Sequence, residues 1–371
     1  MNRVDQYMAD RLAERAAAGN LRRLLPDQPG IDFRSNDYLG IATGGLLNGF
    51  SGEKRKTGST GSRLIAGNSA FAESLESQIA AFHGTEDAII FNSGFDANIG
   101  LLTAIASRET IFLYDELCHA SIIDGIRGSL CRQKFRFAHN NPADLRTLLQ
   151  KHSLTGPVIV VTEAVFSMDG DKAPLTDLVT LCEEFDARLI VDEAHATGVV
   201  GTRGEGLVCA LGLQQRVFAR VHTFGKALGC HGAAVVGSHL LKQYLVNFAR
   251  TFIFTTALPE HSLYAIHNAY QYLAAPGFSN QPLHDLITAF RLRIAQAGIV
   301  GFCDSDTPVQ AMIRGGNEPT KELAARLRQA GLLVNAILYP TVPQGRERLR
   351  ICLHTFNTTE QLDILINHLR S

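Results

Sequence analysis

One lysine lies in a setting that suits covalent chemistry. Lys226 follows an apolar run that ends at Thr223, and Gly225 precedes it directly. A phosphate-binding P-loop would need Ser or Thr after the lysine and a glycine five residues before Gly225, but the chain has Ala227 and Arg220 there. An amine among small residues can instead form a Schiff base with a carbonyl cofactor, whose phosphate a nearby hydroxyl such as Thr223 would bind. The alternative is a solvated surface lysine, because lysine is mostly exposed.

An acid and a histidine follow a second apolar run. Asp192 ends the run at 188–192, and His195 lies three residues further on. The sequence Asp-Glu-Ala-His also occurs in nucleic-acid-stimulated ATPases, but those need a P-loop upstream, which this sequence lacks. A carboxylate beside a cofactor pyridine nitrogen keeps the ring protonated and able to accept electrons, and His195 could hydrogen-bond the phenolic oxygen. Structural roles at a strand end and a helix start are the alternative.

Two more groups could serve a flat, phosphorylated cofactor. His119 follows the apolar run at 110–114, and an imidazole can stack on a ring and donate a proton, although a structural histidine is equally compatible with the sequence. Ser93, Gly94 and Phe95 stand where a strand leads into a helix. Backbone N–H groups are free at a helix start and the helix dipole favours an anion, so this turn suits phosphate.

Apolar runs rich in β-branched residues alternate with helical patterns through the middle of the chain. Strands are expected at 87–91, 110–114, 157–162, 188–192, 217–223 and 233–237. Alternation of this kind predicts an α/β fold with a mostly parallel sheet that helices flank on both faces. Ligands bind at the carboxyl ends of the strands in such sheets, and the polar residues named above follow these runs.

The two ends of the chain differ from this middle. Residues 5–24 are expected to form a helix that Pro26 stops. From residue 277 onward, helical and strand-like patterns indicate a smaller α+β unit. The predicted organisation is therefore an N-terminal helix and arm at 1–40, a large cofactor-binding domain at 41–276 and a small C-terminal α+β domain at 277–371.

Composition excludes several classes of function. The chain has 371 residues, of which 46% are hydrophobic and 19% charged, as in ordinary globular proteins. A net charge of -1 gives no electrostatic case for nucleic-acid or membrane binding, and no apolar run is long enough to span a bilayer. The N-terminus lacks an apolar signal segment, and the 7 cysteines stand singly without a C-x-x-C pair. Reduced thiols in a cytoplasmic protein are expected, with no metal site.

The order of these motifs resembles the fold type I pyridoxal-phosphate (PLP) enzymes, and in particular the α-oxoamine synthases. Ser-Gly-Phe, His, Asp-x-x-His and Thr-x-x-Lys follow one another, and the segments 165–171 and 223–226 are specific signatures of that group. The likeness extends from residue 35 to 351. It implies a large domain with a mostly parallel sheet and a smaller α+β domain, with PLP as cofactor. It also implies an enzyme that condenses an amino acid with an acyl thioester and releases CO2.

The resemblance implies a role for each matching residue of the cofactor site. Lys226 would bind PLP covalently, and Asp192 would pair with the pyridine nitrogen. His195 would contact the phenolic oxygen, and His119 would stack on the ring. The remaining positions expected near the cofactor are Ser93, Gly94, Phe95, Ser167, Thr223, Thr255 and Thr256.

The resemblance also implies a homodimer with active sites at the subunit boundary. Thr255 and Thr256 match a segment that reaches the phosphate of the neighbouring subunit. Asn36 matches a position close to substrate, and Arg350 matches the arginine that binds the amino-acid carboxylate. Without the resemblance, Arg350 would be read as a surface charge on a C-terminal strand.

The substrate pair is less fixed than the reaction. The segments 137–140, 248–250 and 340–343 resemble one member of that group in particular, and this resemblance implies L-alanine with a pimeloyl thioester of coenzyme A or of a carrier protein. Glycine with acetyl-CoA or succinyl-CoA, and serine with palmitoyl-CoA, remain alternatives, because one methyl group changes binding by only ~1–3 kcal/mol. A non-catalytic partner subunit would lack the lysine, which is present. Leu338 stands where some relatives carry arginine, and the role of Arg63 is left open.

Overall fold

The computed structural model describes residues 2–24, 26, 28–45 and 56–370. The chain forms two compact units. The large unit contains Asn36–Ser167 and Lys172–Gln281, and the small unit contains Met1–Ser35, Met168–Asp171 and Pro282–Ser371. The domain limits expected from the sequence remain predictions, and residues 46–55 of the expected large domain lie outside the described part of the chain.

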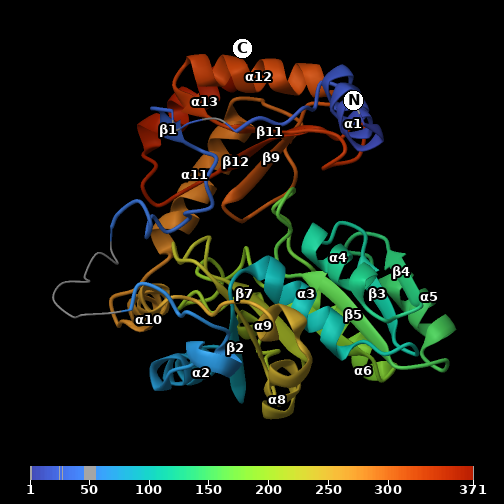
Figure 1. Cartoon of the computed structure of the whole chain (residues 1–371). Coiled ribbons are helices and arrows are strands. Elements are labelled where there is room, and N and C mark those ends of the chain that lie inside the picture. Colours follow the sequence, from blue (N-terminus) through green and yellow to red (C-terminus); the bar gives the residue numbers. More distant parts are fainter. Residues whose placement is uncertain (1, 25, 27, 46–55, 371) are drawn as a thin grey trace. The chain divides into compact units, whose positions relative to one another are not determined.

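A seven-stranded sheet forms the centre of the large unit (Figure 1). Its strand order is β2-β8-β7-β6-β5-β3-β4, and every neighbouring pair is parallel except those made by β8, which runs antiparallel to β2 and β7. This confirms the expected mostly parallel α/β sheet. The strands are β2 (Asp87–Phe91), β3 (Ile111–Asp115), β4 (Gln133–Phe137), β5 (Val158–Glu163), β6 (Arg188–Asp192), β7 (Ala219–Thr223) and β8 (Ala233–Gly237).

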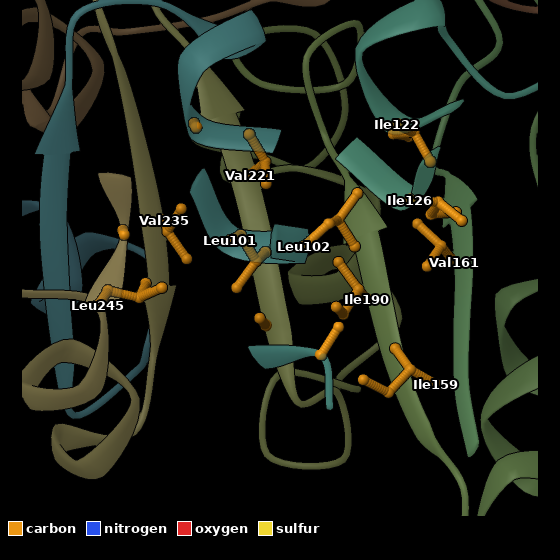
Figure 2. Close-up of a cluster of buried hydrophobic side chains, with 14 of the residues drawn as sticks. Leu101, Leu102, Ile122, Ile126, Ile159, Val161, Ile190, Val221, Val235 and Leu245 are labelled. Carbon is orange, nitrogen blue, oxygen red and sulfur yellow. The ribbon is translucent and has the colours of Figure 1, made fainter. Parts of the chain in front are cut away.

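Helices cover both faces of this sheet. On one face the apolar side chains of α3 and α4 meet those of the strands, and Leu101, Ile126 and Ile190 belong to the resulting core cluster (Figure 2). Helices α8 and α9 extend the same cluster, while α2 packs on β2 and β8, and α6 on β6. The helical segments of the large unit are η1 (Arg63–Gly67, a π-helical turn), α2 (Ala70–Phe82), α3 (Gly94–Ile105), α4 (Ala120–Gly128), α5 (Pro142–His152), α6 (Leu175–Glu184), α7 (Leu207–Ala210), α8 (His239–Phe248), α9 (Arg250–Ile253) and α10 (Glu260–Ala274).

The alternation of side chains along the strands decides which residues reach the α3 face. Successive residues of a strand point to opposite faces, so residues two apart share one. Ile190 of β6 and Val161 of β5 belong to the cluster beneath α3 (Figure 2). The next residues in phase are Asp192 and Glu163, which are also paired in register across the two strands. Two carboxyl groups are thereby expected side by side on the same face of the sheet.

The small unit contains two short sheets. One is antiparallel with the order β11-β12-β9, and the other pairs β1 with β10 in parallel. The stretch 332–337 is divided between two strands: β10 ends at Leu333 and β11 starts at Asn335, because these short strands pair with different partners. The elements are α1 (Arg3–Ala17), β1 (Ile31–Asp32), α11 (Gln281–Gln296), β9 (Val309–Ile313), α12 (Asn317–Gln329), β10 (Leu332–Leu333), β11 (Asn335–Ile337), β12 (Arg348–Cys352) and α13 (Thr359–Arg370).

Helix α1 ends at Ala17 instead of continuing to residue 24, and Gly19 follows with a φ of +66°. All seven cysteines are free. Within the described residues, no helix has the length and apolar character needed to cross a membrane.

Candidate active site

Asp192 is held at the end of β6 by two hydrogen bonds. Asp192 is only 5% exposed. Asn98 Nδ2, from α3, donates to Asp192 Oδ2 at 2.7 Å, and the backbone N–H of Ala194 donates to Oδ1 at 2.9 Å. Both partners are donors, so they favour the ionised carboxylate and fix its orientation. This is the state required of an acid that pairs with a protonated pyridine nitrogen.

Glu163 is a second buried carboxyl group that the sequence did not single out. It is 3% exposed and lies in register with Asp192 on the neighbouring strand. Burial raises the pKa of Glu163 well above its usual range, and the negative charge of Asp192 adds to that rise, while the positive charge of Lys226 opposes it. Burial beside Asp192 therefore favours the neutral form of Glu163. The signal in the sequence was its position, immediately after the apolar run at 157–162.

His119 is positioned by this carboxyl group and by a serine. It caps the N-terminus of α4, and its backbone N–H donates to Glu163 Oε1 at 2.6 Å. The N–H of Ser121 donates to His119 Nδ1 at 3.2 Å, so Nδ1 is the acceptor of a neutral ring and Nε2 carries the proton. Part of His119 is exposed, yet the surrounding protein lowers its pKa by burial; Asp192 opposes that shift and Lys226 adds to it.

A chain of hydrogen bonds joins His119 to Asp192. Asn98 Nδ2 donates to Ser121 Oγ at 3.0 Å as well as to Asp192, and Ser121 Oγ lies 2.8 Å from His119 Nδ1. Asn98 and Ser121 are both buried. A single rigid network therefore orients the predicted stacking histidine and the predicted acid together, and neither linking residue was predicted.

His195 is oriented by a tyrosine that the sequence did not identify. His195 Nδ1 lies 2.7 Å from Tyr38 Oη, and Tyr38 Oη donates to Asn36 Oδ1 at 3.1 Å. Because Tyr38 has only one proton to donate, Nδ1 of His195 is the donor in the first of these bonds. The pair brings Asn36, predicted near substrate, into the same network as His195.

The predicted phosphate-binding residues gather at the N-terminus of α3. Ser93 caps the helix, with its Oγ accepting from the N–H of Asp96 at 3.0 Å. A Cβ on Gly94 would lie 2.2 Å from Thr223 Oγ1, so only glycine fits against that hydroxyl. The first residues of the helix, Gly94 and Phe95, have N–H groups without intrahelical acceptors, and together with the helix dipole they favour an anion.

Thr255 and Thr256 lie against the residue that precedes this cap. Asn92 Nδ2 donates to Thr255 Oγ1 at 3.1 Å and to the carbonyl oxygen of Thr256 at 2.9 Å. Both threonines are thus fixed beside the start of α3 of their own chain. Their predicted contact with a neighbouring subunit remains a prediction.

Lys226 lies in the connection between β7 and β8. The N–H of Gly229 donates to the carbonyl oxygen of Lys226 at 2.9 Å, and Gly229 takes a φ of +61° where a Cβ would meet the backbone of Ala42 at 2.6 Å. The turn is therefore shaped by glycine. Lys226 is half-buried, and its positive charge affects the pKa of both His119 and Glu163. Its amine is consequently on the side of the sheet that carries the acid and the imidazole.

Ser167 and Arg350, the two remaining predicted residues, belong to different units of the chain. Ser167 ends the first segment of the large unit, whereas Arg350 belongs to β12 of the small unit. Arg350 is 5% exposed, and its Nη1 donates to Cys352 Sγ at 3.1 Å. The reading of Arg350 as a surface charge is therefore wrong, and its proposed contact with substrate stays a prediction.

The residues of the large unit fit PLP. They provide one group for each part of the cofactor. These groups are a half-buried amine, an ionised acid, a neutral imidazole and a helix N-terminus with space only for glycine. The described residues contain no group of three or more His, Cys, Asp or Glu side chains able to hold a metal ion.

Comparison with known proteins agrees with this site. The family model for aminotransferase class I and II matches residues 28–369. An 8-amino-7-oxononanoate synthase from Emericella nidulans is 39% identical over 366 residues, covering 91% of this chain and 87% of that protein. The crystal structure of 8-amino-7-oxononanoate synthase from Francisella tularensis is 28% identical with a TM-score of 0.77, covering 93% of this chain and 98% of that one. A structure of SPT with a PLP internal aldimine is 24% identical, with a TM-score of 0.87 and coverage of 100% and 98%, and shows the same fold.

The architecture is that of the fold type I PLP-dependent enzymes, as the motif order indicated. The chain belongs to the aminotransferase class I and II family and, within it, to the group of 8-amino-7-oxononanoate synthases. The family resemblance found in the sequence is thereby confirmed, and PLP is the cofactor expected of an enzyme in this family.

Proposed function

We propose that the protein condenses L-alanine with a pimeloyl thioester of coenzyme A or of a carrier protein. The products are 8-amino-7-oxononanoate, the free thiol of the carrier and CO2, in biotin biosynthesis. The observation that supports this most is the single network that joins Asp192, Asn98, Ser121 and His119 beside Lys226. The 39% identity to a synthase of that name over 91% of the chain supports the choice of reaction within the family.

PLP, when bound, supplies a ring that accepts electrons from the α-carbon of the amino acid. Asp192 would hold a proton on the pyridine nitrogen, since its own two donors keep it ionised and correctly turned. His195 Nε2 would face the phenolic oxygen, because Nδ1 is occupied by Tyr38. Gly94, Phe95 and Thr223 would bind the phosphate.

Lys226 would have two tasks. Its Nζ would hold the cofactor covalently before the amino acid arrives and, once released as a neutral amine, would take a proton from the α-carbon. The neutral form is favoured next to a cationic ring. His119, neutral with its proton on Nε2, would cover one face of the ring and leave the other to the amine.

Arg350 would bind the carboxylate of the amino acid. A buried guanidinium with two donor edges can fix a carboxylate in one orientation, so that the bond to be broken stands perpendicular to the ring. Asn36, held by Tyr38, would contact the substrate near His195. Ser167 would lie close to the cofactor.

Steady-state assays of the PLP-loaded enzyme test the choice of substrates. Alanine and glycine would each be paired with pimeloyl-CoA, acetyl-CoA and succinyl-CoA, and serine with palmitoyl-CoA. The proposal expects the highest kcat/KM for alanine with pimeloyl-CoA. A higher value for glycine with acetyl-CoA or succinyl-CoA would assign the chain to another α-oxoamine synthase activity. No turnover with any pair, together with no visible absorbance from bound PLP, would favour a non-catalytic partner.

We also propose a homodimer in the cytoplasm, in which Thr255 and Thr256 contact the phosphate held by the partner. Mixing two inactive variants tests the shared site: Lys226→Ala in one chain and Thr255→Ala with Thr256→Ala in the other. Mixed dimers contain one intact site, so statistical exchange should restore roughly a quarter of the activity. Absence of recovery in mixed dimers, verified by sedimentation, would place each site within one chain.

A further inference from the structure

Arg63 and Glu76 form a buried ion pair in the large unit. Arg63 Nη1 and Nη2 donate to the two carboxylate oxygens of Glu76 at 2.8 and 3.3 Å. The side chain of Glu76 is 1% exposed and that of Arg63 is 12% exposed. A guanidinium that spans both oxygens of a carboxylate fixes the direction of the contact as well as its distance. The sequence left the role of Arg63 open, and the proposed reaction assigns no step to either residue.

This ion pair joins four segments of the large unit: η1, α2, β2 and α8. Arg63 begins η1, and its Nε donates to Asn68 Oδ1 at 2.8 Å. Glu76 belongs to α2, and its Oε1 also accepts the backbone N–H of Ile90 in β2 at 3.0 Å. Glu76 Oε2 lies 3.4 Å from Nζ of Lys242 in α8. The carboxylate is therefore a junction that holds a turn, a strand and two helices together.

Strand β2 connects this junction to the predicted phosphate site. Ile90 lies two residues before Asn92 and three before Ser93, which caps α3. The amide of Asn92 in turn holds Thr255 Oγ1 and the carbonyl oxygen of Thr256. A shift of β2 at Ile90 would therefore move both the start of α3 and the amide that holds the threonines.

The loop before η1 also holds the segment that contains these threonines. The N–H of Ala257 donates to the carbonyl oxygen of Gly61 at 2.9 Å, and Ser59 Oγ donates to the carbonyl oxygen of Leu258 at 2.5 Å. Gly61 lies only two residues before Arg63. The guanidinium therefore anchors a loop that is itself bonded to the residues directly after Thr256.

Little free space separates Arg63 from the threonine segment. Arg63, Asn92 and Thr255 line one cavity of about 10 Å³, which has room for about one water molecule. The guanidinium carbon of Arg63 also lies 5.7 Å from the ring centroid of Phe252, which borders the same cavity. Because the packing leaves so little room, loss of the fork from Arg63 should be transmitted to its neighbours.

We propose that Arg63 is a positioning residue for the cofactor phosphate. With Glu76, it holds the start of α3 and the threonine segment in place, and it acts through these neighbours without contacting the phosphate. The inference rests on the proposed function, which assigns phosphate binding to these residues. A purely structural ion pair would instead support binding equally with or without a phosphate on the ligand.

Two aldehydes that differ in the phosphate test the proposal on enzyme freed of its cofactor. Visible-absorbance titration of Arg63→Gln should give an apparent Kd for PLP that is raised about tenfold or more, because charge-assisted contacts to the phosphate are misplaced. The Kd for pyridoxal, which lacks the phosphate, should change by less than about twofold. Arg63→Lys keeps the charge but not the fork, so it should fall between the wild type and Arg63→Gln. It also keeps the test available if Arg63→Gln does not fold.

Arg146→Gln is the matched control. Arg146 also spans both oxygens of a carboxylate, that of Glu184, but the two side chains are 43% and 44% exposed. Both Kd values should stay at the wild-type level in this variant. An unchanged Kd for PLP in both Arg63 variants would overturn the proposal, and so would an equal rise for PLP and pyridoxal. Failure of the proposed function has a different signature: the phosphate-dependent change would appear while alanine and pimeloyl-CoA gave no product.

Discussion

Strand β7 presents polar groups to both faces of the sheet, and the two faces use them differently. On the α3 face, Thr223 lies two residues beyond Val221, which belongs to the core cluster. The hydroxyl of Thr223 lies against Gly94 at the start of α3. On the opposite face, Arg220 and His222 are 1% and 0% exposed. Burial alone therefore does not separate a reactive site from a scaffold.

The groups on the opposite face stack on and hydrogen-bond one another, and His222 Nε2 is left without a hydrogen-bond partner among the described residues. His83 stacks on His222 with ring centroids 3.6 Å apart, and its Nε2 lies 2.9 Å from Tyr270 Oη. His222 Nδ1 lies 2.8 Å from Thr197 Oγ1, and Arg220 Nη2 donates to the carbonyl oxygen of His83 at 2.7 Å. Burial lowers the pKa of both His83 and His222, so the two rings are neutral.

The α3 face instead gathers ionisable groups around an amine. Asp192 and Glu163 lie in register, and the positive charge of Lys226 affects the pKa of both Glu163 and His119. What distinguishes the reactive face is this cluster of perturbed groups around a basic side chain.

The strongest test removes the amine. Lys226→Ala should lower kcat by about 10⁴-fold or more, because both covalent attachment and proton transfer depend on one nitrogen. Visible absorbance from lysine-bound PLP should disappear. Lys151→Ala, on the exposed surface of α5, is the control and should retain both properties. Wild-type turnover in the Lys226 variant would remove the basis of the site assignment.

Neutralising the acid should have the next largest effect. Asp192→Asn keeps the shape of the side chain but not its charge, and should lower kcat by roughly 10²–10³-fold, as for the loss of other preorganised electrostatic contacts. Stopped-flow measurement of α-proton exchange on alanine isolates the affected step. Asp177→Asn, in the exposed first turn of α6, serves as the comparison. Equal rates in the two variants would show that the α3 face does not depend on charge.

On the opposite face the main consequence should be for stability. Arg220→Met should lower the free energy of unfolding by about 1–3 kcal/mol, since the buried carbonyl oxygen of His83 loses the hydrogen bond from Arg220 Nη2. Glu193 loses a nearby cation but can take up a proton. Burial already raises the pKa of Glu193 to about 7, and the charge of Arg220 works against that rise. Urea unfolding measures the loss.

The folded Arg220→Met enzyme should keep kcat within about tenfold of the wild type, because Arg220 touches neither substrate nor cofactor in the proposed site. Arg188→Met, at the exposed start of β6, should be nearly neutral in both assays. A loss of kcat comparable to that of Asp192→Asn would mean that the two faces act as one site.

The smallest expected effect on the reaction is at Glu163. Because burial raises the pKa of Glu163 and so favours its neutral form, which Gln resembles in shape and charge, Glu163→Gln should change kcat by less than about threefold. The folded state holds a proton that the unfolded state releases above the ordinary pKa of 4.5, so wild-type stability falls as pH rises from there toward the raised value.

The slope of that loss is about 1.4 kcal/mol per pH unit for one proton. Glu163→Gln should remove this contribution and gain stability relative to the wild type between neutral and alkaline pH. Urea titrations at several pH values measure the difference. A variant that loses stability with pH as steeply as the wild type would indicate that Glu163 is ionised.

The sheet and the reactive side chains were predicted better from the sequence than the residues that hold those side chains in position. Strands with apolar runs were placed within a few residues, but β4 was not predicted, because it is an edge strand with mostly exposed side chains such as Lys134 and Arg136. Lys226, Asp192 and His119 were found from type and spacing. Asn98, Ser121 and Tyr38 were not predicted. The role of an amide or a hydroxyl depends on its hydrogen-bond partner, and these partners are brought together only by the fold.

The pairing of β2 with β8 joins segments that are far apart along the chain. The turn that starts α3 directly follows β2, so the anion-binding end of that helix is anchored to a sheet edge that closes only after Ala233–Gly237 has been synthesised. Contacts of such separation form late, because a long loop must close first. During translation, well over half of the polypeptide must therefore leave the ribosome before the anion-binding end of α3 can be held in place. Chaperones can act on the chain during that interval.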